Sequence, residues 1–149
     1  MNSHDPSQVV DLNAAIASIA ELLRLVAGDR LTLETNLDPQ LSPIPAAPEQ
    51  IDWLLVNLAT NAYHSKPVDS QFIIATSNVE LDAAAARQLG VTPGPYAQVD
   101  VIVAGTGMDA GERAREIVAL AGGRISVHGA GGYRSTITVL LPRLGKAGS

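Results

Sequence analysis

The sequence contains no cysteine and few aromatic residues, and these two absences narrow its chemistry. Without cysteine the chain cannot form disulfides, use a thiol as a nucleophile or bind a metal through thiolates, which agrees with a reducing compartment. Aromatic residues make up 3% of the 149 residues, so a core must be built from Ala, Val, Leu and Ile. With 46% hydrophobic and 17% charged residues, the chain has enough apolar material for one folded domain.

The sequence also has few positively charged residues and no long apolar run. The formal net charge is −5, which argues against nucleic acid or an anionic membrane as an electrostatic partner. No apolar run reaches the roughly 18–20 residues of a membrane span, so no membrane insertion is expected. The polar beginning, MNSHDPSQVVDLN, has no apolar signal-peptide core. These features predict a cytoplasmic protein.

The hydrophobic pattern predicts helices and strands that do not alternate strictly. Apolar residues at spacings of three and four indicate the helices, and alternation indicates the strands. The expected helices are 11–28, 49–65 and 109–123. The expected strands are 30–37, 71–81, 97–105 and the two arms of a hairpin at 124–142. Residues 1–10 are expected to form a flexible lead-in and 144–149 a loose tail, so that one domain spans 11–143.

The order of these elements predicts an α+β fold, a two-layer α/β sandwich in which helices cover one face of a mixed sheet. Strand 97–105 is apolar on both faces near its end and is expected at the centre of the sheet. Residues 38–48 hold four prolines and are expected to be a loop, and 82–96 a connector with an Ala-rich helical turn followed by a Pro/Gly loop. The expected buried face of the first helix is Ile16, Ile19, Leu22, Leu23 and Val26. That of the second is Ile51, Leu54, Leu55, Leu58, Ala59 and Ala62.

Two asparagines lie one turn apart on the apolar helix 49–65, although asparagine is a poor helix former. Asn57 and Asn61 are spaced so that both amides share one face of the helix. A neutral amide oxygen is a hard ligand for Mg²⁺ and adds no charge beside a polyphosphate. Taken alone, the pair also fits the commoner roles of capping a loop or lying at a solvated edge.

Three segments in order, NLATNA, VAGTGMD and EIVALAGGRISVHGAGGYRSTITVLLPR, resemble the ATP-binding domain of sensor histidine kinases in the GHKL superfamily. The resemblance covers nearly the whole chain and implies the Bergerat-type two-layer fold. It also implies ATP and Mg²⁺ as cofactors, with Asn61 as the magnesium ligand and Asn57 facing the same pocket. Gly105, Gly107 and Met108 match the family's first glycine box and are the remaining candidate nucleotide-binding residues.

The chain departs from the family pattern at positions that concern the nucleotide. Val103 stands where the glycine box has an aspartate that accepts a hydrogen bond from adenine, and valine cannot accept one. GTGMD runs almost directly into AGERAREIVALAGG, so the lid and its phenylalanine-rich box are absent. The second glycine turn, which would bind phosphate, is reduced to GMDAGER, with Gly111 as a remnant. Glu112 stands where phosphate would lie and would repel it. Tyr63 and His64 occupy positions where the family usually has a basic and an acidic residue.

The other conspicuous residues are interpreted as structural, and no catalytic residue is assigned. The lone histidines His4, His64 and His128 are expected at the surface. GAGG at 129–132 lies between two strands, so it is expected to be a hairpin turn and not a phosphate loop. Trp53 is expected to pack in the core, with a role as an anchor for a protein partner as the alternative.

Two functions follow from the resemblance. In the favoured one, a domain of two-component or phosphorelay signalling keeps the scaffold but acts as a non-catalytic binding or regulatory module with weak or no ATP binding. Its partners would be a response regulator or a kinase, or a second copy in a homodimer. In the alternative, a functional minimal ATP-binding domain phosphorylates a histidine on a partner protein. The asparagine pair favours the alternative, whereas Val103 and the missing lid count against it.

Overall fold

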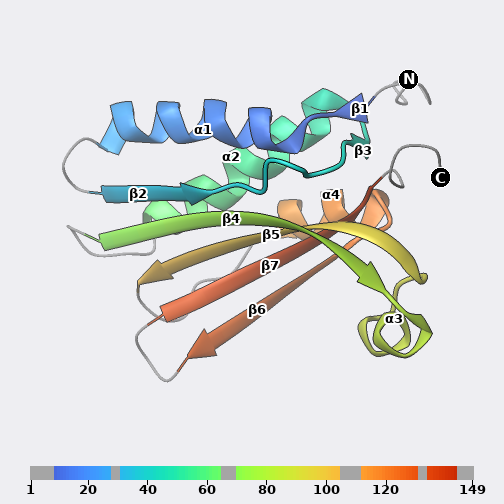
Figure 1. Ribbon diagram of the computed structural model, residues 1–149. Helices are drawn as coiled ribbons and strands as arrows, with labels where there is room; N and C mark the ends of the chain where they lie inside the picture. Colours follow the sequence, from blue (N-terminus) through green and yellow to red (C-terminus); the bar gives the residue numbers. More distant parts are fainter. Residues whose placement is uncertain (1–8, 28–30, 65–69, 105–111, 131–133, 144–149) are drawn as a thin grey trace.

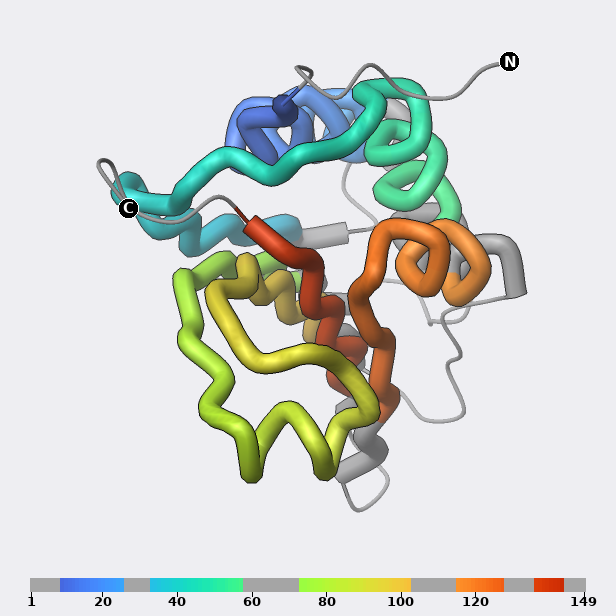
Figure 2. Tube along the Cα trace, turned by 90° about the vertical axis from the view of Figure 1, so that its right-hand side faces the viewer, coloured from blue at the N-terminus to red at the C-terminus, as the bar shows by residue number. Residues whose placement is uncertain are grey.

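The computed structural model describes residues 9–27, 31–64, 70–104, 112–130 and 134–143 of the chain. These residues form two layers, a five-stranded sheet and helices that lie on one of its faces (Figure 1). Turned by 90°, the molecule again shows these helices on one side of the sheet (Figure 2). The predicted α+β two-layer sandwich is therefore confirmed.

The five-stranded sheet has the order β2-β4-β5-β7-β6. Its strands are β2 Leu31–Asn36, β4 Ser70–Leu81, β5 Gly94–Ala104, β6 Arg124–Ala130 and β7 Arg134–Pro142. β2 runs parallel to β4, and the other neighbouring strands are antiparallel, so the sheet is mixed as predicted. β5 lies at the centre of the sheet, as predicted from its two apolar faces.

Three helices, α1 Leu12–Ala27, α2 Pro48–His64 and α4 Glu112–Leu120, form the second layer of the described part. A shorter helix, α3 Ala83–Leu89, joins β4 to β5 at the end of the sheet. It begins with Asp82, whose side chain accepts the Ala85 N–H, and ends with Gly90 in the left-handed conformation at φ 75°. Among the described helices, none is long and apolar enough to cross a membrane.

The core between the layers is aliphatic, as the scarcity of aromatics predicted. It includes Leu12, Ile16, Ile51, Leu54, Ala97, Val99, Val101, Ile137, Val139 and Leu141. Each such Leu or Ile stabilises the fold by about 1.5–3 kcal/mol through its burial. Tyr96 is also fully buried, and its hydroxyl donates to the carbonyl of Thr92 at 2.7 Å, so its polar end is satisfied.

The predicted apolar face of α1 is partly wrong. Ile16 and Leu23 are buried and Ile19 packs against the core, but Leu22 is 54% exposed, and the side chain of Val26 lies outside the described residues. The buried stripe consists of Leu12, Ile16, Ala20 and Leu23. Ala20, a small residue outside the predicted face, is buried, whereas Leu22 is not, so the buried face is turned relative to the predicted one; neighbouring positions on a helix differ by about 100°. On α2, Ile51, Leu54 and Leu55 are buried as predicted.

Two predicted irregular segments contain short strands. Val9–Val10, expected in the flexible lead-in, form β1, and Ile44–Pro45, expected in a loop, form β3; the two strands pair antiparallel. Pro45 is tolerated in β3 because both strands of a two-stranded ribbon are edge strands, where a residue without an N–H need not break a ladder. The connector 82–96 is also shorter than predicted, since β5 already begins at Gly94. α4 is described from Glu112 to Leu120, and its expected start at 109 lies outside the described residues.

A part-buried polar network joins the helical layer to the sheet. Asp11 caps α1 by accepting the Ala14 N–H at 3.2 Å. The Asn13 side chain donates to the carbonyl of Asp38 at 2.6 Å and accepts from the hydroxyl of Thr76 at 2.9 Å. The same hydroxyl accepts the Asp38 N–H at 2.9 Å. α1, the segment after β2, and β4 are thereby held in one arrangement.

Thr76→Val is expected to lower the free energy of unfolding by about 1–3 kcal/mol, because it leaves the part-buried Asp38 N–H without its acceptor. Thr76 is only 7% exposed, so water does not readily replace the lost hydroxyl. Urea unfolding measures the change. Ser77→Ala is the control, since no hydrogen bond of the Ser77 side chain is found among the described residues. Equal losses for the two variants would show that the network contributes nothing.

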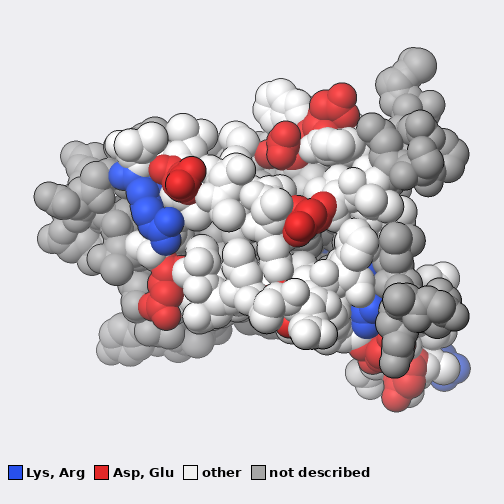
Figure 3. Space-filling view, turned by 45° about the horizontal axis from the view of Figure 1, so that its top comes forward, with Lys and Arg blue, Asp and Glu red and all other residues white. Residues whose placement is uncertain are grey.

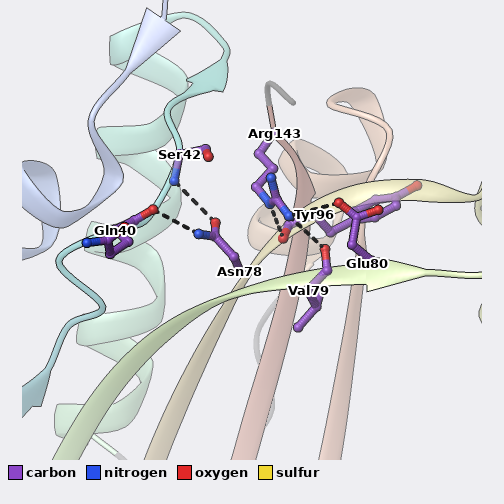
Figure 4. A network of polar contacts seen from close by, with 7 residues as sticks. All are labelled: Gln40, Ser42, Asn78, Val79, Glu80, Tyr96 and Arg143. Atoms are coloured by element: carbon purple, nitrogen blue, oxygen red, sulfur yellow. Dashed lines mark hydrogen bonds and ion pairs between the residues drawn. The ribbon is translucent and has the colours of Figure 1, made fainter. Parts of the chain in front are cut away.

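The end of β7 is fastened to its neighbours by Arg143 (Figure 4). Its side chain is 7% exposed and donates to the carbonyls of Tyr96 at 2.9 Å and Val79 at 3.3 Å. It also contacts the Glu80 carboxylate at 3.2 Å, but Glu80 is 72% exposed, so the ion pair adds little. The backbone contacts therefore carry the interaction, and the folded unit includes Arg143.

Candidate functional site

The candidate site is assembled from the second half of α2, the end of β5 and the start of α4. α2 packs against both α1 and α4, so its position over the sheet is fixed from two sides. β5 ends at Ala104 and α4 begins at Glu112, which leaves residues 105–111 to connect them. Gly105, Gly107 and Met108 lie in this connection, outside the described residues, so their assignment to the nucleotide stays a prediction.

Asn57 is the one predicted site residue whose side chain is described. It is half-buried, and its amide nitrogen donates to the carbonyl of Trp53, one turn earlier on the same helix, at 2.7 Å. This bond fixes the amide group to the backbone of α2 itself. Because this contact uses only the amide nitrogen, it is compatible with the predicted role of Asn57, which is to face the nucleotide pocket.

Asn61 lies one turn after Asn57, within the helical part of α2. Its side chain is outside the described residues, as are those of Tyr63 and His64. The helix confirms that Asn57 and Asn61 are spaced to share a face. The proposed magnesium ligand itself stays a prediction.

Val103 occupies the penultimate position of the central strand. Its backbone is paired with Phe72 of β4 on one side and Ser135 of β7 on the other. It follows the buried Val101 by two residues. A valine has no polar atom in its side chain, so whatever its rotamer this position offers no side-chain acceptor to an adenine amine.

The described residues fit a magnesium–nucleotide group only incompletely. They include the amide of Asn57, but no group of three His, Asp or Glu residues that could hold a metal ion is found in the described ranges. At the strand end, position 103 lacks an acceptor.

Trp53 corrects a prediction, because it is 56% exposed and does not lie in the core. The buried stripe of α2 passes through Ile51, Leu54 and Leu55, and position 53 faces away from it. Val56, three residues later on the helix, is 39% exposed. The two side chains place apolar surface on α2 beside the asparagine pair, which agrees with the alternative of a partner anchor.

The helical face of the molecule carries scattered charges. In Figure 3, the basic side chains drawn on this face lie in separate small groups beside acidic ones and do not merge into one basic patch. This face therefore offers no extended positive surface of the kind that binds nucleic acid.

Comparison with known proteins points to one group. No family model matches the sequence. The sensor kinase CckA of Brucella abortus (strain 2308) is 30% identical over 104 residues, which are 69% of this chain. The chain spans only 11% of the length of that curated relative.

Solved structures with the same architecture include three histidine kinases. The mycobacterial sensor histidine kinase MprB has 14% identity and a TM-score of 0.70, and the match covers 91% of this chain and 97% of that one. The nucleotide-free catalytic domain of histidine kinase ThkA has 15% identity and a TM-score of 0.72, with 91% and 95% covered. Full-length ShkA in complex with AMPPNP has 17% identity and a TM-score of 0.74, with 98% and 33% covered. At such identities the likeness establishes the fold.

Proposed function

We infer that this chain, which has the fold of the ATP-binding domain of sensor histidine kinases in the GHKL superfamily, acts in two-component signalling as a non-catalytic binding or regulatory module. The observation that carries this inference is Val103 at the end of β5. A nucleotide site of this type relies on a carboxylate there to accept a hydrogen bond from adenine. The scaffold is retained, whereas the group that selects the base is not.

The affinity for nucleotide that is lost through Val103 can be estimated. A hydrogen bond to a charged group contributes about 1.5–3 kcal/mol, which corresponds to about one to two decades in affinity. The short connection 105–111 adds to this loss, because it leaves no length for a lid of tens of residues between β5 and α4. Glu112, at the start of α4, brings negative charge to the end of the helix where phosphate would bind.

The binding partners of this module would be other proteins. A response regulator or a kinase, or a second copy of the chain, fits a cytoplasmic phosphorelay component. Trp53 and Val56 offer apolar side chains on α2, and a partly exposed tryptophan is a common anchor at protein interfaces. Whichever partner binds, it would be recognised by the surface of the domain and not through transfer of a phosphoryl group.

Calorimetric titration of the chain with ATP and Mg²⁺ tests this function. We expect a dissociation constant weaker than about 1 mM, because the base-selecting contact and the lid are both missing. AMPPNP with Mg²⁺ serves as a second ligand that cannot be turned over. A dissociation constant in the micromolar range for either nucleotide would contradict the proposal.

The alternative is a functional minimal domain that binds Mg²⁺ and ATP and phosphorylates a histidine on a partner. Two observations favour it: the asparagines are retained one turn apart on α2, and ShkA, which shares the fold, holds AMPPNP. In this case Asn61→Ala should abolish nucleotide binding that the unchanged chain shows, since the amide oxygen of Asn61 would be the magnesium ligand. Binding of equal strength by both proteins would refute the alternative.

A further inference from the structure

The sheet ends at β2 in an edge that no described strand covers. β2 pairs only with β4, so one side of its backbone lacks a strand partner within the described residues. Figure 1 shows β2 at the margin of the sheet, directly beneath α1. Open edges of this kind add strands from other molecules unless something blocks them.

A groove runs between this edge and α1. It has a volume of about 290 Å³ and is lined by Ala17, Ser18, Ala20, Glu21, Arg24 and Thr35. Five of these residues belong to α1, and most are small, which leaves space beside β2. An added strand needs both unpaired backbone and room for its alternate side chains, and this edge offers the two together.

One side chain crosses from the helix to the edge. Arg24, in the last turn of α1, donates from its guanidinium to the carbonyl of Leu33, in the middle of β2, at 3.2 Å. That carbonyl is a backbone acceptor of the edge strand. Glu21 lines the same groove three residues before Arg24, a spacing at which opposite charges on a helix attract each other. An exposed arginine is thereby held against the strand.

We propose that Arg24 keeps the β2 edge from pairing with the same edge of a second copy of this chain. A symmetric pair of edges would join two sheets into one, and each copy would have to move Arg24 away from Leu33 first. The charged guanidinium thus occupies the backbone acceptor at the point where two identical edges would meet. This role is independent of whether the domain binds nucleotide.

The test compares self-association of the unchanged chain with that of Arg24→Ala and Arg24→Met. Methionine keeps an apolar stem of similar length and removes the donor and the charge. Arg87→Ala, in the last turn of α3, is the control, since Arg87 is exposed and lies away from this edge. Sedimentation velocity over a range of protein concentrations gives the association constant, and amide hydrogen exchange locates the contact.

We expect both Arg24 variants to self-associate about tenfold more tightly or more, the factor that corresponds to loss of one hydrogen bond per copy. Exchange should slow with concentration at residues 31–36 and nowhere else in the sheet, while Arg87→Ala behaves as the unchanged chain. The proposal is overturned if both Arg24 variants stay monomeric at the same concentrations. It is also overturned if they associate without protecting 31–36, or if the unchanged chain already shows this protection.

Discussion

Val103→Asp is expected to strengthen binding of ATP with Mg²⁺ by about ten- to a hundredfold. The substitution supplies a carboxylate at the end of β5, where the resemblance to sensor histidine kinases places the acceptor for the adenine amine. A hydrogen bond to a charged group is worth about 1.5–3 kcal/mol, and each 1.4 kcal/mol is a factor of ten. The backbone at this position is held by Phe72 and Ser135 on the neighbouring strands, so the new side chain starts from a fixed point.

Two further variants separate recognition of adenine from other effects. Val103→Ala offers no acceptor and should bind as weakly as the unchanged chain. Val103→Asn keeps a neutral acceptor and should recover part of the gain, which matters if a carboxylate near the buried Val101 lowers stability. Thermal unfolding of each protein shows whether the fold survives. If the folded Asp and Asn variants both bind no better than Val103→Ala, the site has lost more than its base contact.

Gly123→Ala is expected to lower the free energy of unfolding by about 3–5 kcal/mol, a large share of the roughly 5–15 kcal/mol of a typical domain. A Cβ atom at Gly123 would overlap with the carbonyl oxygen of Leu140 and lie 3.1 Å from Cγ1 of Val118. The Leu140 oxygen belongs to the backbone of β7, which is paired on both sides and cannot move aside cheaply. The N–H of Gly123 also closes α4 by donating to Val118 at 2.9 Å.

Gly122→Ala is the matched control for this substitution. Gly122 has a φ of 84°, but a Cβ there would meet only Cγ of Pro142, at an ordinary 3.5 Å. Its cost should be limited to the left-handed conformation, about 1–2 kcal/mol. Urea unfolding of the two variants measures the difference. If Gly122→Ala proves as destabilising as Gly123→Ala, steric contact with β7 is not what requires glycine at 123.

Much of the fold could be predicted from the spacing of apolar residues. The stripe of Ile51, Leu54 and Leu55 identified α2 and its buried face, and the two apolar faces of β5 placed it at the centre of the sheet. These patterns are reliable because burial on one or two sides leaves a direct periodic signature. The hairpin of β6 and β7 could also be predicted, because a glycine-rich stretch separates two segments of alternating apolar and polar residues.

Features that depend on packing between elements could not be predicted in this way. Leu22 and Trp53 have the composition of core residues, yet the directions in which α1 and α2 face leave both exposed. β1 and β3 are two-residue strands that exist only because the chain brings them side by side. Asn13 has the chemistry of a helix cap, and only the position of Thr76 on β4 turns it into a bridge between the two layers.

The candidate site likewise contains some features that could be predicted from the sequence and others that could not. The spacing of Asn57 and Asn61 on one helix was apparent in the sequence, because helical periodicity alone determines it. The bond from Asn57 to the carbonyl of Trp53 was not, because it depends on a rotamer. The roles of Asn61, Gly105, Gly107 and Met108 depend on side chains and a connection outside the described residues, and they remain predictions from the resemblance.

The side-chain amide signals of Asn57 and Asn61 report most directly on whether the domain binds nucleotide. Both can be followed by nuclear magnetic resonance in ¹⁵N-labelled protein during a titration with ATP and Mg²⁺. The account predicts that neither signal approaches saturation below about 1 mM nucleotide. Saturation of both signals at micromolar nucleotide, lost in Asn61→Ala, would contradict it and identify a working ATP site.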